Sequence, residues 1–194
     1  MAFVNSSFGL IMGSMLHKIL LLIYDFRSRG DSVPIEDFAL LERDFARKLG
    51  LRNFDWVRKE DYSPTHLPTR PLSSCRVALV STAGIYQRGQ KPFALRLSGD
   101  ASFRLIDGEK SVAELRARHG GYDGRRAGKD LNCLFPLDRL HELVAAKRVE
   151  SASKRHISFM GYVPYPTELE EVIAPRAGQI LIEDGVDLVL LSPA

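Results

Sequence analysis

The run Val77-Ala78-Leu79-Val80 decides how the rest of the chain is interpreted. It is short, apolar and without alternation, as are strands that are buried on both faces of a parallel sheet. Similar runs follow at Ile157-Ser158-Phe159-Met160 and at 186–191, with helical patterns between the runs. This order of strands and helices predicts an α/β domain. We expect a three-layer, doubly wound, mainly parallel sheet that is incomplete at its C-terminus.

The two predicted helices have recognisable ends. Pro136 opens the first helix, at a position where its missing N–H costs no hydrogen bond. Lys147 and Arg148 are predicted near the end of this helix, where positive charge suits the helix dipole. In the second helix, Pro175 is expected to kink or split the helix. Gly185 can adopt the left-handed conformation that ends it.

A stretch at residues 8–24 is strongly apolar. His17 and Lys18 interrupt it, and the uninterrupted part is far shorter than the ~20 residues that span a bilayer. No basic residue precedes the stretch and no cleavage site follows it, so a secretory signal is not indicated. We interpret it as an apolar helix that packs on the body of the protein, or as sequence before the true start codon. Membrane association is not expected.

Between this stretch and the sheet, the chain changes character twice. Apolar residues at helical spacing predict a helix over 35–49 that Gly50 ends. Three prolines within 63–71 exclude a regular helix or a central strand and indicate an extended linker. We therefore divide the chain into an N-terminal helical segment with a Pro-rich linker, 1–70, and the α/β domain, 71–194.

The composition is that of an ordinary globular protein. The chain has 194 residues and a formal net charge of +3, which is too weak to indicate a nucleic-acid partner. Two cysteines, Cys75 and Cys133, are too few for a disulfide framework or a zinc site of the usual kind, so a cytoplasmic location is expected. The apolar neighbours of Cys133 favour a small packed side chain over a nucleophile.

Ligands of open parallel sheets bind outside the carboxyl ends of the strands. In this chain those ends are residues 81–84, 160–162 and 192–194. The polar segment at 99–132 is expected to form a shaped loop that supplies binding groups. Residues 81–84 match neither a P-loop nor a dinucleotide fingerprint, so phosphate binding of those kinds is not predicted.

The charged residues of the polar segment each have two interpretations. Asp100 and Asp130 are candidates for general acid–base groups, but an Asp before a helical turn is more often a cap. Arg104 can clamp a substrate carboxylate with two hydrogen bonds. It can equally pair with Asp100 or Asp107. The sequence leaves these alternatives open.

Two histidines are candidate proton carriers, because histidine titrates near neutral pH. They are His119 and His156. A lone histidine is more often a hydrogen-bonded structural residue, and the place of His156 at the start of a predicted strand favours that role. His119, Asp123 and Asp130 have metal-binding side chains, but their spacing matches no metal motif, so no metal site is predicted.

Several sequence blocks resemble those of one protein family, and they occur in the same order. This family is the selenoprotein B family of the glycine, sarcosine, betaine and D-proline reductases. The resemblance covers 76–194, about three-fifths of the chain. The blocks are RVALVSTAG at 76–84, GDASFR at 99–104, HGGYD at 119–123, KDLN at 129–132, FPLDRLHELV at 135–144, HISFMG at 156–161 and DGVDLVLL at 184–191.

The resemblance implies an oxidoreductase subunit that acts in a complex. Members of this family take part in reductive cleavage at the α-carbon of an amino acid or of its N-methylated relative. A pyruvoyl group on a partner subunit forms a Schiff base with amine substrates, and a thiol or selenol carrier protein is a further partner. A selenocysteine, or a cysteine in some relatives, attacks the activated carbon. A selenolate is ionised at neutral pH and is a strong nucleophile, by the logic that makes a low-pKa thiolate reactive.

The nucleophile implied by the resemblance is missing from this sequence. In the family, the selenocysteine and a nearby cysteine come directly after the strand that here ends at 190–194. Selenocysteine is encoded by UGA, which is ordinarily a stop codon. We therefore expect that the reading frame was ended at a misread UGA and that the catalytic residue is codon 195. Genomic sequence past Ala194 tests this expectation.

The resemblance also suggests which loop residues shape the site. Within this set, Arg104 is a candidate carboxylate clamp and His119 a candidate proton donor. The catalytic candidates are His119, Asp123 and Asp130, and the substrate-binding candidates are Asp100, Ser102, Arg104, Tyr122 and Asn132.

Two other functions stay open. One is a non-catalytic α/β binding or assembly module on the same scaffold, and codon 195 would distinguish it from the reductase subunit. The other is a flavodoxin-like cofactor binder, which the missing phosphate loop disfavours. The substrate itself is not encoded in any pattern that we can interpret.

Overall fold

The computed structural model describes residues 35–48, 50, 53, 55, 68–96, 98–120 and 127–193. The chain divides into two compact units, Met1–Trp56 and Val57–Ala194. The division between linker and domain at residue 70 stays a prediction. The apolar stretch at 8–24 lies outside the described residues.

The first unit contains α2 (Ile35–Lys48), where the apolar spacing predicts a helix. Gly50 follows with a φ of +102°, and its N–H donates to the carbonyl of Arg47. This conformation is accessible to glycine and strained for other residues, which explains why the helix ends here.

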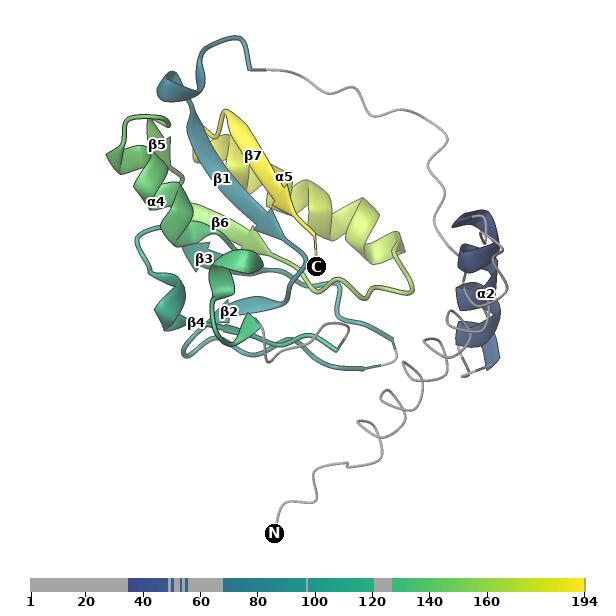
Figure 1. Ribbon diagram of the computed structural model, residues 1–194. Helices are drawn as coiled ribbons and strands as arrows, with labels where there is room; N and C mark the ends of the chain where they lie inside the picture. The colour runs from purple at the N-terminus through teal and green to yellow at the C-terminus, as the bar shows by residue number, and fades with distance from the viewer. Residues whose placement is uncertain are drawn as a thin grey trace, which may run out of the picture. The chain divides into compact units, whose positions relative to one another are not determined.

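The second unit is built around one central strand, β1 (Arg76–Ser81). β5 (Ser151–Ala152) and β6 (Arg155–Ser158) run parallel to one side of β1, and β7 (Leu188–Ser192) runs parallel to its other side. β3 (Arg104–Asp107) pairs antiparallel with β6. Figure 1 shows β1 beside β7, with β6 and β3 following across the sheet.

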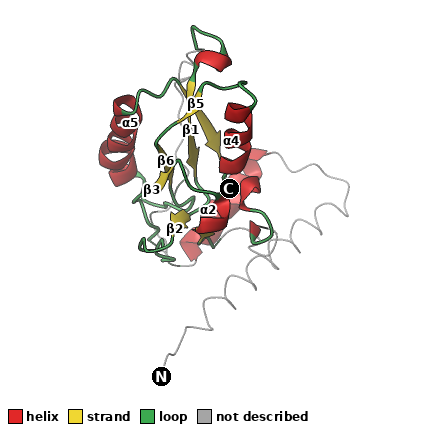
Figure 2. Cartoon of the chain, turned by 90° about the vertical axis from the view of Figure 1, so that its left-hand side faces the viewer, coloured by secondary structure: helices red, strands yellow, loops and turns green. Residues whose placement is uncertain are grey.

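The predicted α/β class is confirmed, but the sheet is mixed. The mixing comes from β3, which reaches β6 in the opposite direction, whereas the pairings of β1 are all parallel. α4 (Leu137–Ala145) and α5 (Ala174–Glu183) lie on opposite sides of the sheet (Figure 2). The doubly wound, three-layer arrangement stays a prediction.

The face of β1 that carries Val77 and Leu79 forms the main core. Phe135, Leu137 and Leu140 pack against it from the segment that leads into α4. A small antiparallel pair, β2 (Ile85–Gln87) with β4 (Leu115–Ala117), contributes to the same cluster. Short 3₁₀ turns connect these parts at Leu72–Ser74 (η1), Val112–Glu114 (η2) and Leu131–Cys133 (η3).

The ends of the two helices agree with the sequence in part. α4 stops at Ala145, so Lys147 and Arg148 lie near its end as expected, just beyond its last turn. Lys147 has a φ of +55°, which turns the chain away from the helix direction. Before α5, a π-helix at Leu169–Ile173 (η4) accommodates Pro175 by changing the hydrogen-bond pattern. Gly185 ends α5 with a φ of +65°, as expected.

The two cysteines differ in exposure. Cys75 is buried, whereas Cys133 is exposed, so the interpretation of Cys133 as a packed apolar side chain is wrong. η3 has three residues per turn, which brings Leu131 and Leu134 onto one side. Both leucines pack against the core, and Cys133 between them faces away.

Within the described parts of the chain, no helix has the length and apolar character that a membrane crossing requires.

Candidate functional site

The carboxyl ends of three strands meet at one edge of the sheet. Ser81, Ser158 and Ser192 are the last residues of β1, β6 and β7, and the pairing places Ser81 opposite each of the other two. The N–H of Thr82 donates to the carbonyl of Ser192 at 3.2 Å. The strand ends singled out as a ligand-binding edge therefore lie together.

A loop that contains Asp100, Ser102 and Arg104 lies beside this edge. It is placed there because Arg104 begins β3 directly opposite Ser158. The preceding Gly99 has a φ of +73°, and a Cβ at this position would stand 2.5 Å from the carbonyl oxygen of Tyr162. The loop thus touches the segment that follows β6, and glycine is required at the contact.

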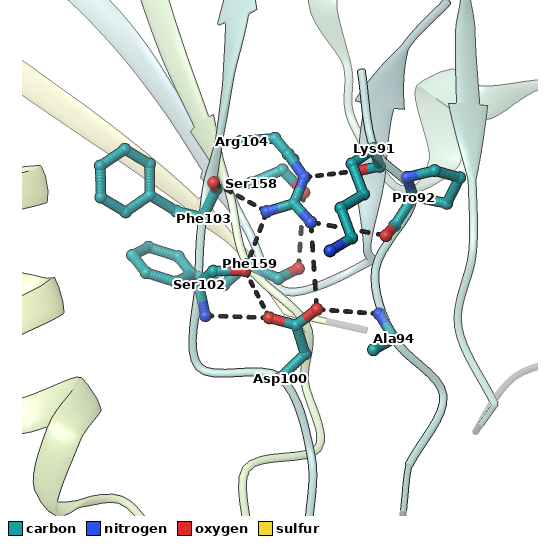
Figure 3. Close-up of polar contacts among 9 residues, drawn as sticks. All are labelled: Lys91, Pro92, Ala94, Asp100, Ser102, Phe103, Arg104, Ser158 and Phe159. Atoms are coloured by element: carbon teal, nitrogen blue, oxygen red, sulfur yellow. Dashed lines mark hydrogen bonds and ion pairs between the residues drawn. The ribbon is translucent and has the colours of Figure 1, made fainter. Parts of the chain in front are cut away.

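Asp100 is the hydrogen-bond centre of this loop. Its carboxylate accepts from the backbone N–H of Ala94 at 2.8 Å and of Ser102 at 3.1 Å, and from the Ser102 hydroxyl (Figure 3). Burial acts to raise the pKa of Asp100, but the hydrogen bonds from Ala94 and Ser102 and the charge of Arg104 outweigh it and lower this pKa. Asp100 is therefore ionised at neutral pH and acts as an acceptor.

Arg104 turns its guanidinium toward the same loop. Nε donates to the carbonyl of Lys91 at 2.7 Å, and Nη1 donates to the Ser102 hydroxyl at 2.8 Å and to the carbonyl of Phe103 at 3.0 Å. The guanidinium carbon lies 4.2 Å from the centre of the Phe93 ring, and Nη2 lies 3.9 Å from Asp100. Most guanidinium donors therefore serve the loop (Figure 3), and pairing with Asp100 is the alternative that the geometry favours.

Asp130 and Asn132 connect the 3₁₀ turn η3 to the start of α4. Asp130 caps η3 by accepting from the N–H and the side-chain amide of Asn132, each at 2.9 Å, and these bonds lower its pKa. The Asn132 side chain also donates to Asp138 at 3.2 Å and accepts from the Asp138 N–H at 3.1 Å. The geometry favours the capping interpretation of Asp130.

His119 reaches the same edge through its neighbour in the chain. The N–H of Arg118 donates to the carbonyl of Gly84, two residues beyond Thr82 at the end of β1. Burial lowers the pKa of His119, so the ring is neutral at physiological pH. Tyr122 and Asp123 lie outside the described residues. Among the residues that are described, no three His, Cys, Asp or Glu side chains gather as a metal site.

His156 has the structural role that its position in a strand indicates. It is fully buried in β6, and its Nδ1 accepts the backbone N–H of Leu79 at 2.9 Å. The ring packs edge-on against Phe135 at 6.0 Å between centres. Burial, and to a smaller extent the charge of His141, lower the pKa of His156 to about 4, so the ring is neutral and able to accept.

Sequence reasoning missed the serines at the strand ends. The signal was present, because Ser81, Ser158 and Ser192 each belong to or directly follow one of the apolar runs that predict the strands. Only the pairing of the strands shows that the three stand at the same level.

Most of this chain, including the range that contains the site, is similar in sequence to known proteins. Residues 39–194 match the family model described as glycine/sarcosine/betaine reductase selenoprotein B. D-proline reductase subunit gamma of Acetoanaerobium sticklandii is 38% identical over 142 residues, which are 70% of this chain and 58% of that protein. Glycine reductase complex component B subunit gamma of Carboxydothermus hydrogenoformans is 29% identical over 157 residues, 77% of this chain and 33% of that protein.

The chain spans less than two thirds of the length of both relatives. No solved structure matches it. The family match begins at Ala39, so it extends through most of α2, beyond the blocks at 76–194 that carry the resemblance. With a match over residues 39–194, the chain belongs to the glycine/sarcosine/betaine reductase selenoprotein B family.

Proposed function

We propose that the chain is an oxidoreductase subunit for reductive cleavage at the α-carbon of an amino acid or of its N-methylated relative. The observation that carries the proposal is the convergence of family blocks at one edge of the sheet. The block at 76–84 leaves β1 there, and the block at 99–104 ends at Arg104, opposite Ser158. The block at 129–132 precedes Leu134, whose carbonyl accepts from Ser81 and Ser192 at the ends of β1 and β7. Blocks far apart in sequence thus form one surface.

In this proposal the nucleophile is a selenocysteine or a cysteine that follows β7. The family resemblance gives it this position, and the carboxyl end of β7 lies at the edge where the loops converge. The selenolate or thiolate forms a bond to the α-carbon while the carbon–nitrogen bond breaks, and the nitrogen leaves with the electron pair and takes up a proton. His119 is the proposed proton donor at this edge. Because its ring is neutral at physiological pH, it must take up a proton before it can donate one to the leaving nitrogen.

Two partners complete the reaction in the proposal. A pyruvoyl group on another subunit activates the amine of the substrate, and the residues of this chain are not needed to hold it. A thiol or selenol carrier protein then attacks the selenium or sulfur of the nucleophile and supplies the reducing electrons. The bond to the α-carbon breaks, the α-carbon keeps the electron pair and takes up a proton, and a disulfide or a selenium–sulfur bond forms. Because thiols of this kind stay reduced in the cytoplasm, that compartment is the proposed location.

The loop around Asp100 shapes the proposed substrate site. Asp100, Ser102 and Arg104 form an interconnected group, and Arg104 binds two backbone carbonyls of its own loop at 3.0 Å or less. If Arg104 also clamps a substrate carboxylate, it gives up one of these bonds when substrate binds. Asn132 and Asp130 act from the other side of the edge, and Tyr122 and Asp123 remain candidates outside the described residues.

The proposal is tested with the complete subunit, produced with selenocysteine incorporation and combined with its partner subunits. We expect dithiol-dependent reduction of at least one of glycine, sarcosine, betaine or D-proline. A complex that reduces none of these substrates contradicts the proposal.

Variants at Arg104 separate its two roles. A clamp predicts that Arg104→Ala raises KM for a carboxylate substrate with little change in kcat, and an unchanged KM excludes the clamp. A purely positioning role lowers kcat instead, because the loop loses its shape. Arg116→Ala is the matched control, because Arg116 is exposed on β4 and its Nη1 binds the carbonyl of Leu115.

A non-catalytic assembly module is the second candidate, and the exposed face of β7 favours it. Leu190 and Leu191 are 48% and 69% exposed on a strand at the side of the described sheet. Apolar residues on such a strand are suited to contact another chain. This role is supported if the subunit assembles with its partners but the complex keeps full activity after the residues following β7 are replaced.

A further inference from the structure

The serine at the end of β7 is hydrogen-bonded to the segment that precedes α4. Ser81, Ser158 and Ser192 form a row across the carboxyl ends of β1, β6 and β7. Ser81 and Ser158 are almost completely buried, and Ser192 is partly buried. The three hydroxyls stand at the level where the chain leaves the sheet and enters the candidate site.

Two members of the row donate to the same acceptor. The Ser81 hydroxyl donates to the carbonyl oxygen of Leu134 at 3.0 Å, and the Ser192 hydroxyl donates to the same oxygen at 2.9 Å. A carbonyl oxygen has two lone pairs, so Leu134 can accept both bonds. The segment before α4 is thereby tied to the ends of two neighbouring strands.

The end of β7 has a second attachment next to the first. The carbonyl of Ser192 accepts the N–H of Thr82, so both the backbone and the side chain of Ser192 are held. The neighbouring Leu191 is 69% exposed and provides little packing. Hydrogen bonds rather than apolar contacts therefore set the direction in which the chain continues from β7.

We propose that Ser192 is a positioning residue for the reductive cleavage. Its bond to Leu134, shared with Ser81, fixes the exit of β7 and so aims the nucleophile that follows this strand at the substrate. The inference rests on the proposed function. Positioning of this kind affects the rate of the chemical step more than substrate binding, because reacting atoms must meet within a narrow geometry.

Ser192 is the member of the row that can be tested without damage to the fold. Removal of the Ser81 hydroxyl would take an acceptor from the buried N–H of Ala83, and removal of the Ser158 hydroxyl would take one from the N–H of Ile85. When Ser192 is truncated, the carbonyl of Leu134 still accepts from Ser81. Ser192→Ala therefore removes the bond to β7 and leaves Leu134 satisfied.

The experiment compares Ser192→Ala, Ser192→Thr and Ser151→Ala in the complete subunit. Ser151 is the control, because it is a partly buried strand serine at the opposite end of the sheet, where it accepts from Arg76 at 3.3 Å. We expect Ser192→Ala to lower kcat on the order of tenfold with KM within about twofold of wild type. Ser192→Thr keeps the hydroxyl and restores kcat, and Ser151→Ala behaves as wild type.

A second measurement separates this inference from the proposed function. The alkylation rate of the selenol or thiol after β7 by iodoacetamide, followed over pH, reports its placement without substrate. We expect Ser192→Ala to change this rate and Ser192→Thr to restore it. If the wild-type complex reduces no substrate, the proposed function fails, and the alkylation rates still decide on Ser192. Equal kcat and equal alkylation rates in wild type and Ser192→Ala overturn the inference, as does an equal effect of Ser151→Ala.

Discussion

The two ends of the sheet are fastened by different chemistry. At the amino end, Asp184 accepts from Arg155 at 2.7 and 2.9 Å, and Asp187 accepts the N–H of Arg76 and pairs with Arg70. At the carboxyl end, serine hydroxyls and backbone groups carry the bonds, and the charges of Asp100 and Arg104 are directed to each other and to their own loop.

The amino end is therefore held mainly by ion pairs, and the carboxyl end mainly by hydrogen bonds that require a precise geometry. Ion pairs that water reaches, such as Arg155 with Asp184 at 35% and 10% exposure, tolerate small displacements and are weakened by salt, because water and ions screen them. Hydroxyl–carbonyl bonds and close backbone contacts are sensitive to distances of a few tenths of an ångström. The end with the geometric fastening is the end where the family blocks converge, as expected for a surface that must hold reacting groups in place.

The largest effect is expected from a methyl group at the carboxyl end. In Gly99→Ala the new Cβ would stand 2.5 Å from the Tyr162 carbonyl oxygen, at a φ of +73°. We expect a loss of about 2–4 kcal/mol in the free energy of unfolding, measured with urea. Gly89→Ala is the control, because Gly89 has a φ of +89° with open space around it, and it should cost only about 1 kcal/mol. Equal losses in the two variants would contradict the close contact.

A smaller loss in the free energy of unfolding is expected when the pH is lowered, because of His156 in the centre of the sheet. The pKa of His156 is about 4 in the folded protein and 6.5 in the unfolded chain, so the unfolded state binds more protons as pH falls. Stability from this group is complete above pH 6.5 and is lost progressively down to pH 4, by about 3 kcal/mol. Urea unfolding as a function of pH measures this loss.

The matched variant for this prediction is His156→Asn. An asparagine oxygen can accept the N–H of Leu79 near the position of Nδ1 but does not titrate. The variant is expected to be less stable at pH 7 and to have a flatter pH profile between pH 6.5 and 4. A profile as steep as that of the wild type would show that another group causes the acid sensitivity.

The smallest effect is expected at the amino end. Asp184→Asn removes the charge that pairs with Arg155, and Arg155 is 35% exposed. The midpoint of urea unfolding should fall slightly at low ionic strength, and the difference from wild type should shrink in 1 M salt. Glu142→Gln, which breaks the pair of Glu142 with Arg139 at 58–59% exposure, should have no measurable effect. If the loss of stability in Asp184→Asn does not depend on salt, the amino end is held by specific hydrogen bonds, as the carboxyl end is, and the comparison fails.

The strands that the sequence predicts are those with continuous apolar runs. β1 and β6 are mostly buried, whereas Leu190 and Leu191 of β7 are exposed, so the expected burial of all three strands on both faces is wrong for β7. β1 extends one residue beyond its run at each end, β6 begins and ends two residues before its run, and β7 begins two residues after the start of its run and ends one residue after it. β3 was not predicted, because it has four residues, begins and ends with a charge, and finds its partner only through β6, about fifty residues later in the chain. Strand formation at such an edge depends on the neighbour more than on the local pattern.

The candidate site was predictable where its bonds are local. Asp130 was interpreted as a cap or a catalytic group, and the geometry favours the cap. For Arg104 the sequence indicates either a clamp for a substrate carboxylate or the partner of a carboxylate in the chain. Its ion-pair partner Asp100 lies only four residues earlier in the sequence. The bonds from Ser81 and Ser192 to the carbonyl of Leu134 were not predictable. Every residue has a backbone carbonyl, so only the folded structure shows which one lies near the two hydroxyls. Roles in substrate binding stay predictions.

The position of His156 also bears on the register of β1 with β5 and β6. Arg76 stands opposite Ser151 and Val80 stands opposite Ile157, so the side of β5 and β6 contains two more residues than β1 between these pairs. Where the regular pairing is interrupted by these two extra residues, the His156 imidazole accepts the N–H of Leu79. A shift by one residue would invert the faces of β6, and a shift by two would remove the ring from its donor. The ring therefore favours a single register of β1 and β6, the one in which the N–H of Leu79 has its acceptor.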